Sequence, residues 1–141
     1  MTPEQIAEAD TEHAHQTALF CWAAANQARF PELRWMHAIP NGGLRSKAQA
    51  GKLKAEGVKS GVPDVFLPVA RGKYHGLYIE MKKPALQPVR GGRGGVSDEQ
   101  SEFIAAARAN GYAAAVCYSW DHAKNLICRY LDENLCLELT R

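Results

Sequence analysis

Two short β-prone runs, 65–69 and 77–81, constrain the fold of this chain more than any other feature. The stretch between them is rich in residues typical of turns, so the two runs predict a β-hairpin. If the strands pair from the ends nearest the turn, Asp64 lies opposite Glu80, and directly facing Cβ atoms are about 5 Å apart. Because two facing carboxylates repel each other, this register indicates a divalent cation between their oxygens.

The second strand has one chemical face and one packing face. Because side chains alternate along a strand, Lys82 lies on the same face as Glu80, while Ile79 and Met81 point the other way into a core. Two carboxylates and a backbone carbonyl, that of Met81, suit a hard cation such as Mg²⁺ or Mn²⁺. Lys82 would stabilise the charge that develops on a phosphate under attack by water.

Each fragment alone also has an ordinary structural explanation. Aspartate after proline is common in turns, and an acid two residues before a lysine is common on an exposed strand face. The surrounding sequence adds weight, because Asn41 and two glycines, a basic segment, the hairpin and a helix beginning near Ser97 follow one another in order.

In this arrangement the chain resembles the VRR-NUC family, the virus-type replication-repair nucleases, within the PD-(D/E)xK nuclease superfamily. The resemblance runs from about Glu12 to about Ile127 and is to the small stand-alone form that is typical of phages and prophages. It implies divalent-metal-dependent hydrolysis of phosphodiester bonds in branched or otherwise structured DNA, as in Holliday-junction resolvases, often by a homodimer.

The resemblance also implies roles for five residues. Asp64 and Glu80 match the metal carboxylates of the family, and Lys82 matches its catalytic lysine. Glu12, on the first helix, matches an additional acidic residue. Gln100 matches a glutamine on the helix that follows the core strands.

Helix periodicity gives weaker, independent support for the last two residues. Glu12 shares a stripe with Leu19 and Ala23, which should face the core, although the helix dipole also favours an acid near a helix start. Gln100 lies three residues after Ser97, so a capping box alone could explain it. Both explanations stay open for Glu12 and for Gln100.

The 141 residues carry a formal net charge of +2, which does not by itself require a nucleic-acid partner. The basic residues gather, however, in a segment that leads into Asp64 and holds only one acid, Glu56. They are Arg45, Lys47, Lys52, Lys54 and Lys59. A solvated helix face is the ordinary explanation, but the position beside Asp64 favours contacts with DNA phosphates.

A second basic stretch carries Arg90 and Arg93 among four glycines. Its composition predicts a flexible loop without a fixed fold. Two uses of this loop stay open. It could close on DNA, or it could be a tolerated insertion, because long surface loops cost little stability.

The order of elements predicts an α/β fold with a PD-(D/E)xK restriction-endonuclease-like core, a mixed β-sheet flanked by helices. Besides the hairpin, we expect helices at 3–28, 47–55, 98–109 and 121–131 and extended segments at 35–39 and 112–118. The last strand follows a crossover helix and should pair in parallel with the Glu80 strand. The expected core residues are Leu19, Trp22, Phe103, Ile104, Val116, Leu126 and Ile127. Residues 1–141 are expected to form a single nuclease domain.

Other classes of site and location are disfavoured. The four cysteines form no CxxC pair and are expected to be reduced, and the five histidines, expected at the surface or core edge, are too scattered for a zinc site. No run is apolar enough to cross a bilayer, and the first residues lack the features of a secretion signal, so a cytoplasmic protein is expected. Leu131, Leu135, Leu137 and Leu139 are candidates to extend the sheet or form a dimer interface.

The sequence thus favours an endodeoxyribonuclease dependent on Mg²⁺ or Mn²⁺ and leaves alternatives open. A non-catalytic module that binds structured DNA would keep binding after loss of Asp64. A flap or nick nuclease would differ in its preferred DNA structure. A restriction-type enzyme that reads a sequence would need recognition elements for which this short chain has little room.

Overall fold

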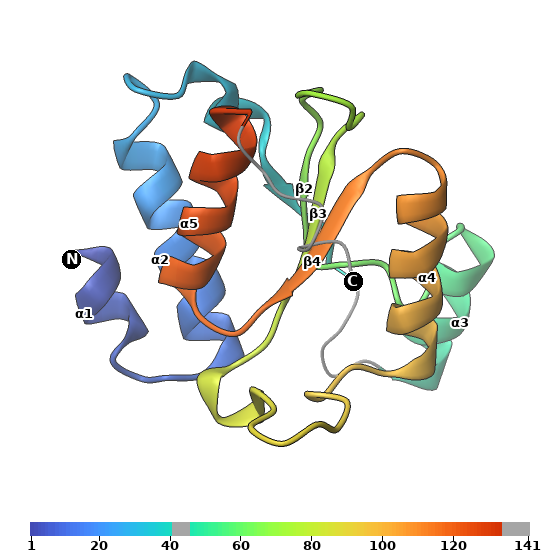
Figure 1. Ribbon diagram of the computed structural model, residues 1–141. Coiled ribbons are helices and arrows are strands. Elements are labelled where there is room, and N and C mark those ends of the chain that lie inside the picture. Colours follow the sequence, from blue (N-terminus) through green and yellow to red (C-terminus); the bar gives the residue numbers. More distant parts are fainter. Residues whose placement is uncertain (41–45, 134–141) are drawn as a thin grey trace.

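A four-stranded sheet separates two helical layers in the computed structural model, which describes residues 1–40 and 46–133. The elements follow in the order α1 (Pro3–Ala7), α2 (Glu12–Ala25), the 3₁₀ helix η1 (Pro31–Trp35), β1 (His37–Ala38), α3 (Lys47–Ala55), β2 (Val65–Leu67), β3 (Leu77–Met81), the 3₁₀ helix η2 (Pro84–Leu86), α4 (Asp98–Ala109), β4 (Ala113–Cys117) and α5 (Trp120–Leu131). Helices α2 and α5 cover one face of the sheet and α4 covers the other (Figure 1).

The sheet has the mixed topology that the sequence predicts. Its strands lie in the order β1-β2-β3-β4, with β3 and β4 parallel and the other pairs antiparallel. In the hairpin, Val65 pairs with Ile79 and Leu67 with Leu77. This is the predicted register, and one step further along it sets Asp64 opposite Glu80. The predicted α/β fold class is confirmed.

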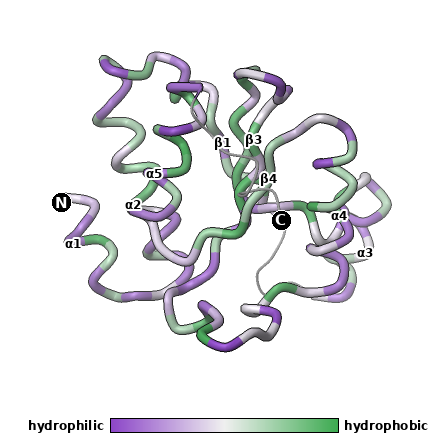
Figure 2. Tube along the Cα trace, in the orientation of Figure 1, coloured by the Kyte–Doolittle hydropathy of each residue, from purple (hydrophilic) through white to green (hydrophobic). Residues whose placement is uncertain are grey.

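The main core lies between the sheet and the layer formed by α2 and α5. Figure 2 shows hydrophobic residues concentrated along the central strands. Of the predicted core residues, five are buried: Leu19, Trp22, Ile104, Leu126 and Ile127. Phe103 and Val116 are only partly buried and pack on a smaller cluster under α4. Trp120 is buried, whereas Trp35 is exposed.

The prediction of one long helix from residue 3 to residue 28 is wrong. The chain breaks at Asp10, whose φ of 55° lies in the left-handed region, and Thr11 then caps α2 by accepting a hydrogen bond from the Ala14 amide at 3.0 Å. The side chain of Asp10 is held by His15 Nε2 at 2.8 Å. Two side-chain contacts therefore stabilise a turn where the composition alone permits a helix.

The remaining expectations differ less from the structure. The segment expected to be extended at 35–39 is partly the 3₁₀ helix η1, with β1 following it, while α3 and α4 have the predicted bounds. None of the helices within the described ranges is long and apolar enough to cross a membrane. Arg45, Cys136, Leu135, Leu137 and Leu139 lie outside the described residues.

Gly61 fixes the approach of the segment before β2 to the first turn of α4. Its φ is +90°, and a Cβ added there would lie 2.6 Å from the backbone carbon and oxygen of Glu99. Gly61→Ala is therefore expected to lower the free energy of unfolding by about 3 kcal/mol, because backbone strain and a steric clash add. Urea unfolding measures the loss.

Gly57→Ala is the matched control, because Gly57 also has a positive φ, +100°, but a Cβ there meets nothing within 4 Å. This control should lose only the cost of the left-handed backbone, about 1 kcal/mol. Equal losses in the two variants would show that the contact with Glu99 does not constrain the protein.

Candidate metal centre

Three carboxylates from separate parts of the sequence meet at one end of the sheet. Glu12 comes from the first turn of α2, Asp64 from the residue before β2 and Glu80 from β3. One oxygen of each lies within 4.8 Å of the others. The structure therefore brings the additional acid Glu12 together with the two acids that the hairpin register pairs.

Two backbone amides, one from β3 and one from the residue after β1, fix Asp64. The Met81 amide donates to Asp64 Oδ2 at 2.8 Å, and the Ile39 amide donates to the Asp64 carbonyl at 2.7 Å. The side chain is thus held across the hairpin, although Asp64 lies just outside β2. Pro63, buried before it, leaves that position without an amide donor.

Glu80 is only 2 % exposed, and its two oxygens have different surroundings. Oε2 accepts a hydrogen bond from Gln100 Nε2 at 3.2 Å and lies 3.6 Å from Lys82 Nζ. Within the described residues, Oε1 is buried without a hydrogen-bond partner. A buried carboxylate oxygen left unpaired is costly, so this atom needs a cation or another donor.

Gln100 combines the two roles that the sequence left as alternatives. Its Oε1 accepts a hydrogen bond from the Ser97 amide at 2.9 Å, and its backbone amide donates to Ser97 Oγ at 3.1 Å, which completes the capping box of α4. The other end of the same amide holds Glu80. The helix cap therefore orients a side chain of the carboxylate cluster.

The cluster is electrostatically unfavourable without a cation. Burial, followed by the negative charge of the Asp64 carboxylate, raises the pKa of Glu80 to about 9, against the opposing charge of Lys82. Burial and the charge of Asp64 also raise the pKa of Glu12. Three converging carboxylates fit a hard divalent cation such as Mg²⁺ or Mn²⁺, which takes oxygen ligands and would bring charge compensation.

The raised pKa of Glu80 predicts an unusual pH dependence of stability in the absence of divalent cations. The unfolded chain releases this proton near pH 4.5, whereas the folded protein holds it up to about pH 9. The contribution of the Glu80 proton to the free energy of unfolding is therefore fully present below pH 4.5 and is lost as the pH rises through 9. Calorimetry in EDTA should show a melting temperature that falls over this range.

Glu80→Gln removes this contribution and should melt several degrees above the wild type at pH 8 in EDTA, with a smaller difference at pH 5. Glu8→Gln changes an exposed carboxylate outside the cluster and serves as the control. Parallel melting curves of wild type and Glu80→Gln across this range would contradict the protonated state of Glu80.

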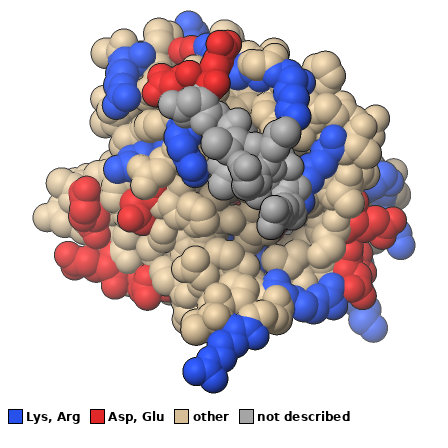
Figure 3. Space-filling model, in the orientation of Figure 1, with Lys and Arg blue, Asp and Glu red and all other residues tan. Residues whose placement is uncertain are grey.

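The predicted basic residues do not join the cluster. Lys47, Lys52, Lys54 and Lys59 are exposed on α3 and in the segment after it. Arg90 is exposed on the loop between β3 and α4, and Arg93 on the same loop forms an ion pair with Asp98. Figure 3 shows lysine and arginine side chains projecting at the lower edge of the molecule, where Figure 1 places this loop.

His15 is buried, whereas the sequence predicts a histidine at the surface or at the edge of the core. Its Nδ1 accepts a hydrogen bond from the Trp120 amide at 3.0 Å, while Nε2 contacts Asp10. His15 thereby ties the turn before Glu12 to the first residue of α5. A signal was present in the sequence, because His15, Leu19 and Trp22 follow the i, i+4, i+7 spacing of a buried stripe.

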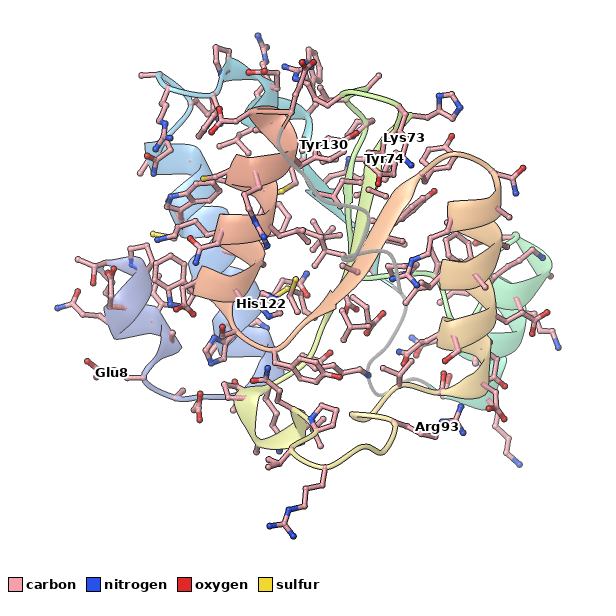
Figure 4. The ribbon with its side chains drawn as sticks, in the orientation of Figure 1. Glu8, Lys73, Tyr74, Arg93, His122 and Tyr130 are labelled. Carbon is pink, nitrogen blue, oxygen red and sulfur yellow. The ribbon has the colours of Figure 1, made fainter. Side chains whose placement is uncertain are left out.

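A pocket of about 150 Å³ lies at the other end of the sheet. Figure 4 labels three of its lining residues, Lys73, Tyr74 and Tyr130, far from Arg93. Arg71, which also lines the pocket, donates to the carbonyls of Ala70 and Leu131 and pairs with Glu32. Its guanidinium therefore serves to join the hairpin turn to the end of α5.

Comparisons with known proteins agree with this geometry. The model of the VRR-NUC domain matches residues 1–121. A solved structure described as a VRR-NUC domain protein is similar over 93 % of this chain and 96 % of its own, with 29 % sequence identity and a TM-score of 0.70. No protein with a curated description matches the chain.

Proposed function

The chain belongs to the VRR-NUC family of nucleases, and we propose that it is a divalent-metal-dependent endonuclease acting on branched or otherwise structured DNA. The observation that carries the proposal is the buried, unpartnered Oε1 of Glu80, which lies in a cluster of three carboxylates beside Lys82. A pair of facing acids that only stabilised the fold would not leave such an atom without a partner.

Asp64 and Glu80 would hold Mg²⁺ or Mn²⁺, with the carbonyl of Met81 as a further ligand and Glu12 close enough to take part. A cation bound there lowers the pKa of a coordinated water and neutralises negative charge on the phosphate. Because Asp64 Oδ2 accepts a hydrogen bond from the Met81 amide, the same strand that carries Glu80 orients the second carboxylate.

Lys82 would place a positive charge beside the reacting phosphate. It is only 8 % exposed, and its ammonium lies 3.6 Å from Glu80 Oε2, so packing restricts its motion. A fixed charge that needs no reorganisation stabilises developing negative charge more effectively than a mobile surface lysine. Gln100, in turn, holds Glu80 in place through its side-chain amide.

The exposed lysines of α3 and of the segment after it would bind the DNA backbone. Helix α3 has no buried residue, and the chain continues from its basic residues through Gly61 to Asp64. Phosphate contacts of this kind position DNA without reading its sequence. Arg90 would add to this surface, whereas Arg93 is partly compensated by Asp98.

A preference for branched DNA and a homodimeric state complete the proposal. Cleavage of two strands at a four-way junction requires two metal centres. The described part of this 141-residue chain has a single carboxylate cluster, so each chain supplies one metal centre. Sedimentation of the protein with and without junction DNA tests this. A strict monomer on the junction would exclude the resolvase activity while leaving flap or nick cleavage.

The test of the proposed function is cleavage of matched labelled four-way junction, flap, nicked and intact duplex DNA in Mg²⁺, Mn²⁺ or EDTA. Cleavage that requires the metal and favours one branched DNA would support the proposal. Tight binding without cleavage in either metal would instead favour a non-catalytic DNA-binding module. Cutting of intact duplex at one sequence would favour a restriction-type enzyme.

Gln100→Glu separates the two roles of Gln100. Glutamate at this position keeps the capping box of α4, but it loses the amide donor to Glu80 and places a fourth carboxylate beside it. Residues that orient metal ligands typically contribute 10- to 100-fold, and we expect the cleavage rate to fall by about tenfold or more. Gln100→Ala should lose both the helix cap and the cleavage rate. If Gln100→Glu cleaves as fast as the wild type, Gln100 does not contribute to the site.

A further inference from the structure

The loop of residues 84–96 connects two segments whose side chains contact Glu80 of the carboxylate cluster. Lys82, two residues before it, lies 3.6 Å from Glu80, and Gln100, four residues after it, donates to the same carboxylate at 3.2 Å. Figure 1 shows the loop projecting beyond the end of the sheet at which β3 stops.

Two glycines near the end of the loop make contacts that its composition does not predict. The Tyr118 hydroxyl donates to the Gly94 carbonyl at 3.1 Å, and a Cβ added at Gly94 would overlap that hydroxyl. A Cβ at Gly95 would lie 2.8 Å from Leu86 Cδ1. The glycines therefore permit close contacts that hold the two arms of the loop together and onto the end of β4.

The tip of this loop is apolar and exposed, with a cation beside it. Val89 is 94 % exposed and Leu86 is 38 % exposed, and they are two of the four large hydrophobic side chains that are exposed within the described residues. Arg90, next to Val89, has no ion-pair partner in the same described part of the chain. An exposed valine beside a guanidinium without an ion-pair partner in the described residues can contact a ligand that has both apolar and anionic parts.

We infer that the tip of the 84–96 loop is a DNA-structure reader, in which Val89 packs on the face of an unstacked base while Arg90 binds a neighbouring phosphate. The inference rests on the proposed function for the identity of the ligand. Val89 would be the residue that distinguishes branched or interrupted DNA from an intact duplex.

Nucleic acid with an unstacked base fits the chemistry of this tip. An intact duplex covers its base faces by stacking and presents phosphates outside, whereas unpaired bases at a branch or flap present an apolar face beside charged phosphates. An apolar protein partner would cover Val89 but would leave the adjacent Arg90 without a counter-charge.

The test compares Val89→Ser with the wild type in binding to a flap duplex and to the matched intact duplex, with Ca²⁺ replacing Mg²⁺. A 2-aminopurine at the branch reports unstacking of the base next to it. Val89→Ser is expected to weaken flap binding about fivefold, to weaken duplex binding less than about twofold and to reduce the 2-aminopurine signal. Trp35→Ser is the matched control, because Trp35 is also an exposed apolar residue beside an arginine, Arg34, on η1. This control should change neither affinity.

The outcomes separate this inference from the proposed function. Suppose that the wild type cleaves flaps. If Val89→Ser then binds both DNAs as the wild type does, or loses affinity equally for both, the inference is overturned and the proposed nuclease function stands. If no DNA is cleaved but Val89→Ser alone loses the flap preference, the reader stands and the catalytic proposal fails. Dissociation of a dimer by Val89→Ser in sedimentation would assign the tip to a second copy of the chain and overturn the inference.

Discussion

Asp64→Asn is expected to lower metal-dependent DNA cleavage by at least about a thousandfold, which corresponds to about 4 kcal/mol of transition-state stabilisation. Asparagine can still accept the hydrogen bond from the Met81 amide, so the backbone between β2 and β3 should stay in place. The variant loses one negative charge at the point where three carboxylates converge. Its Mg²⁺ or Mn²⁺ binding, measured by calorimetry, should fall with its cleavage rate.

DNA binding by Asp64→Asn should be retained or strengthened, because removal of a negative charge near the phosphate path reduces repulsion. Fluorescence anisotropy with a labelled four-way junction measures this, and Glu8→Gln is the control for loss of a carboxylate outside the cluster. If Asp64→Asn cuts within tenfold of the wild type while binding metal normally, Asp64 is not a metal ligand. Loss of DNA binding together with cleavage would instead point to a damaged fold.

The hairpin at the centre of the site could be predicted from sequence because its determinants are local. Two short β-prone runs and a turn-rich connection fix the register, and the register alone brings Asp64 and Glu80 together. The capping box of α4 was equally local, since Ser97 and Gln100 are three residues apart. The contact of Gln100 with Glu80 depends on how α4 packs on β4, and the sequence of α4 alone does not determine that packing.

The features that the sequence analysis missed depend on contacts between distant residues. The break before α2 is stabilised by His15, which in turn is fixed by the Trp120 amide more than one hundred residues away. The contact of Gly94 with the Tyr118 hydroxyl, just beyond β4, likewise joins segments that are far apart in the sequence. Glycine-rich composition predicts flexibility only where no such partner is available. Here the small glycines allow the partner to approach.

The second large effect is expected from Lys82→Met, which keeps the length and apolar stem of the side chain but removes its charge. Cleavage of structured DNA in Mg²⁺ should fall about 100- to 1,000-fold, because a fixed charge beside the reacting phosphate is lost. Lys82 also lowers the pKa of Glu80, so its loss should weaken metal binding at neutral pH and restore part of it at higher pH. DNA affinity should change little, since Lys82 is buried among the carboxylates.

Lys73→Met is the matched control, because Lys73 lies in the turn of the same hairpin but at the opposite end of β3. It should leave both the cleavage rate and its pH profile unchanged. Lys82→Arg adds a second comparison: a guanidinium keeps the charge but is planar and larger than the ammonium, so it should recover only part of the rate. A Lys82→Met rate within tenfold of the wild type at saturating metal would show that the charge of Lys82 does not act on the reacting phosphate. In that case the 3.6 Å contact with Glu80 Oε2 serves only to compensate a buried carboxylate.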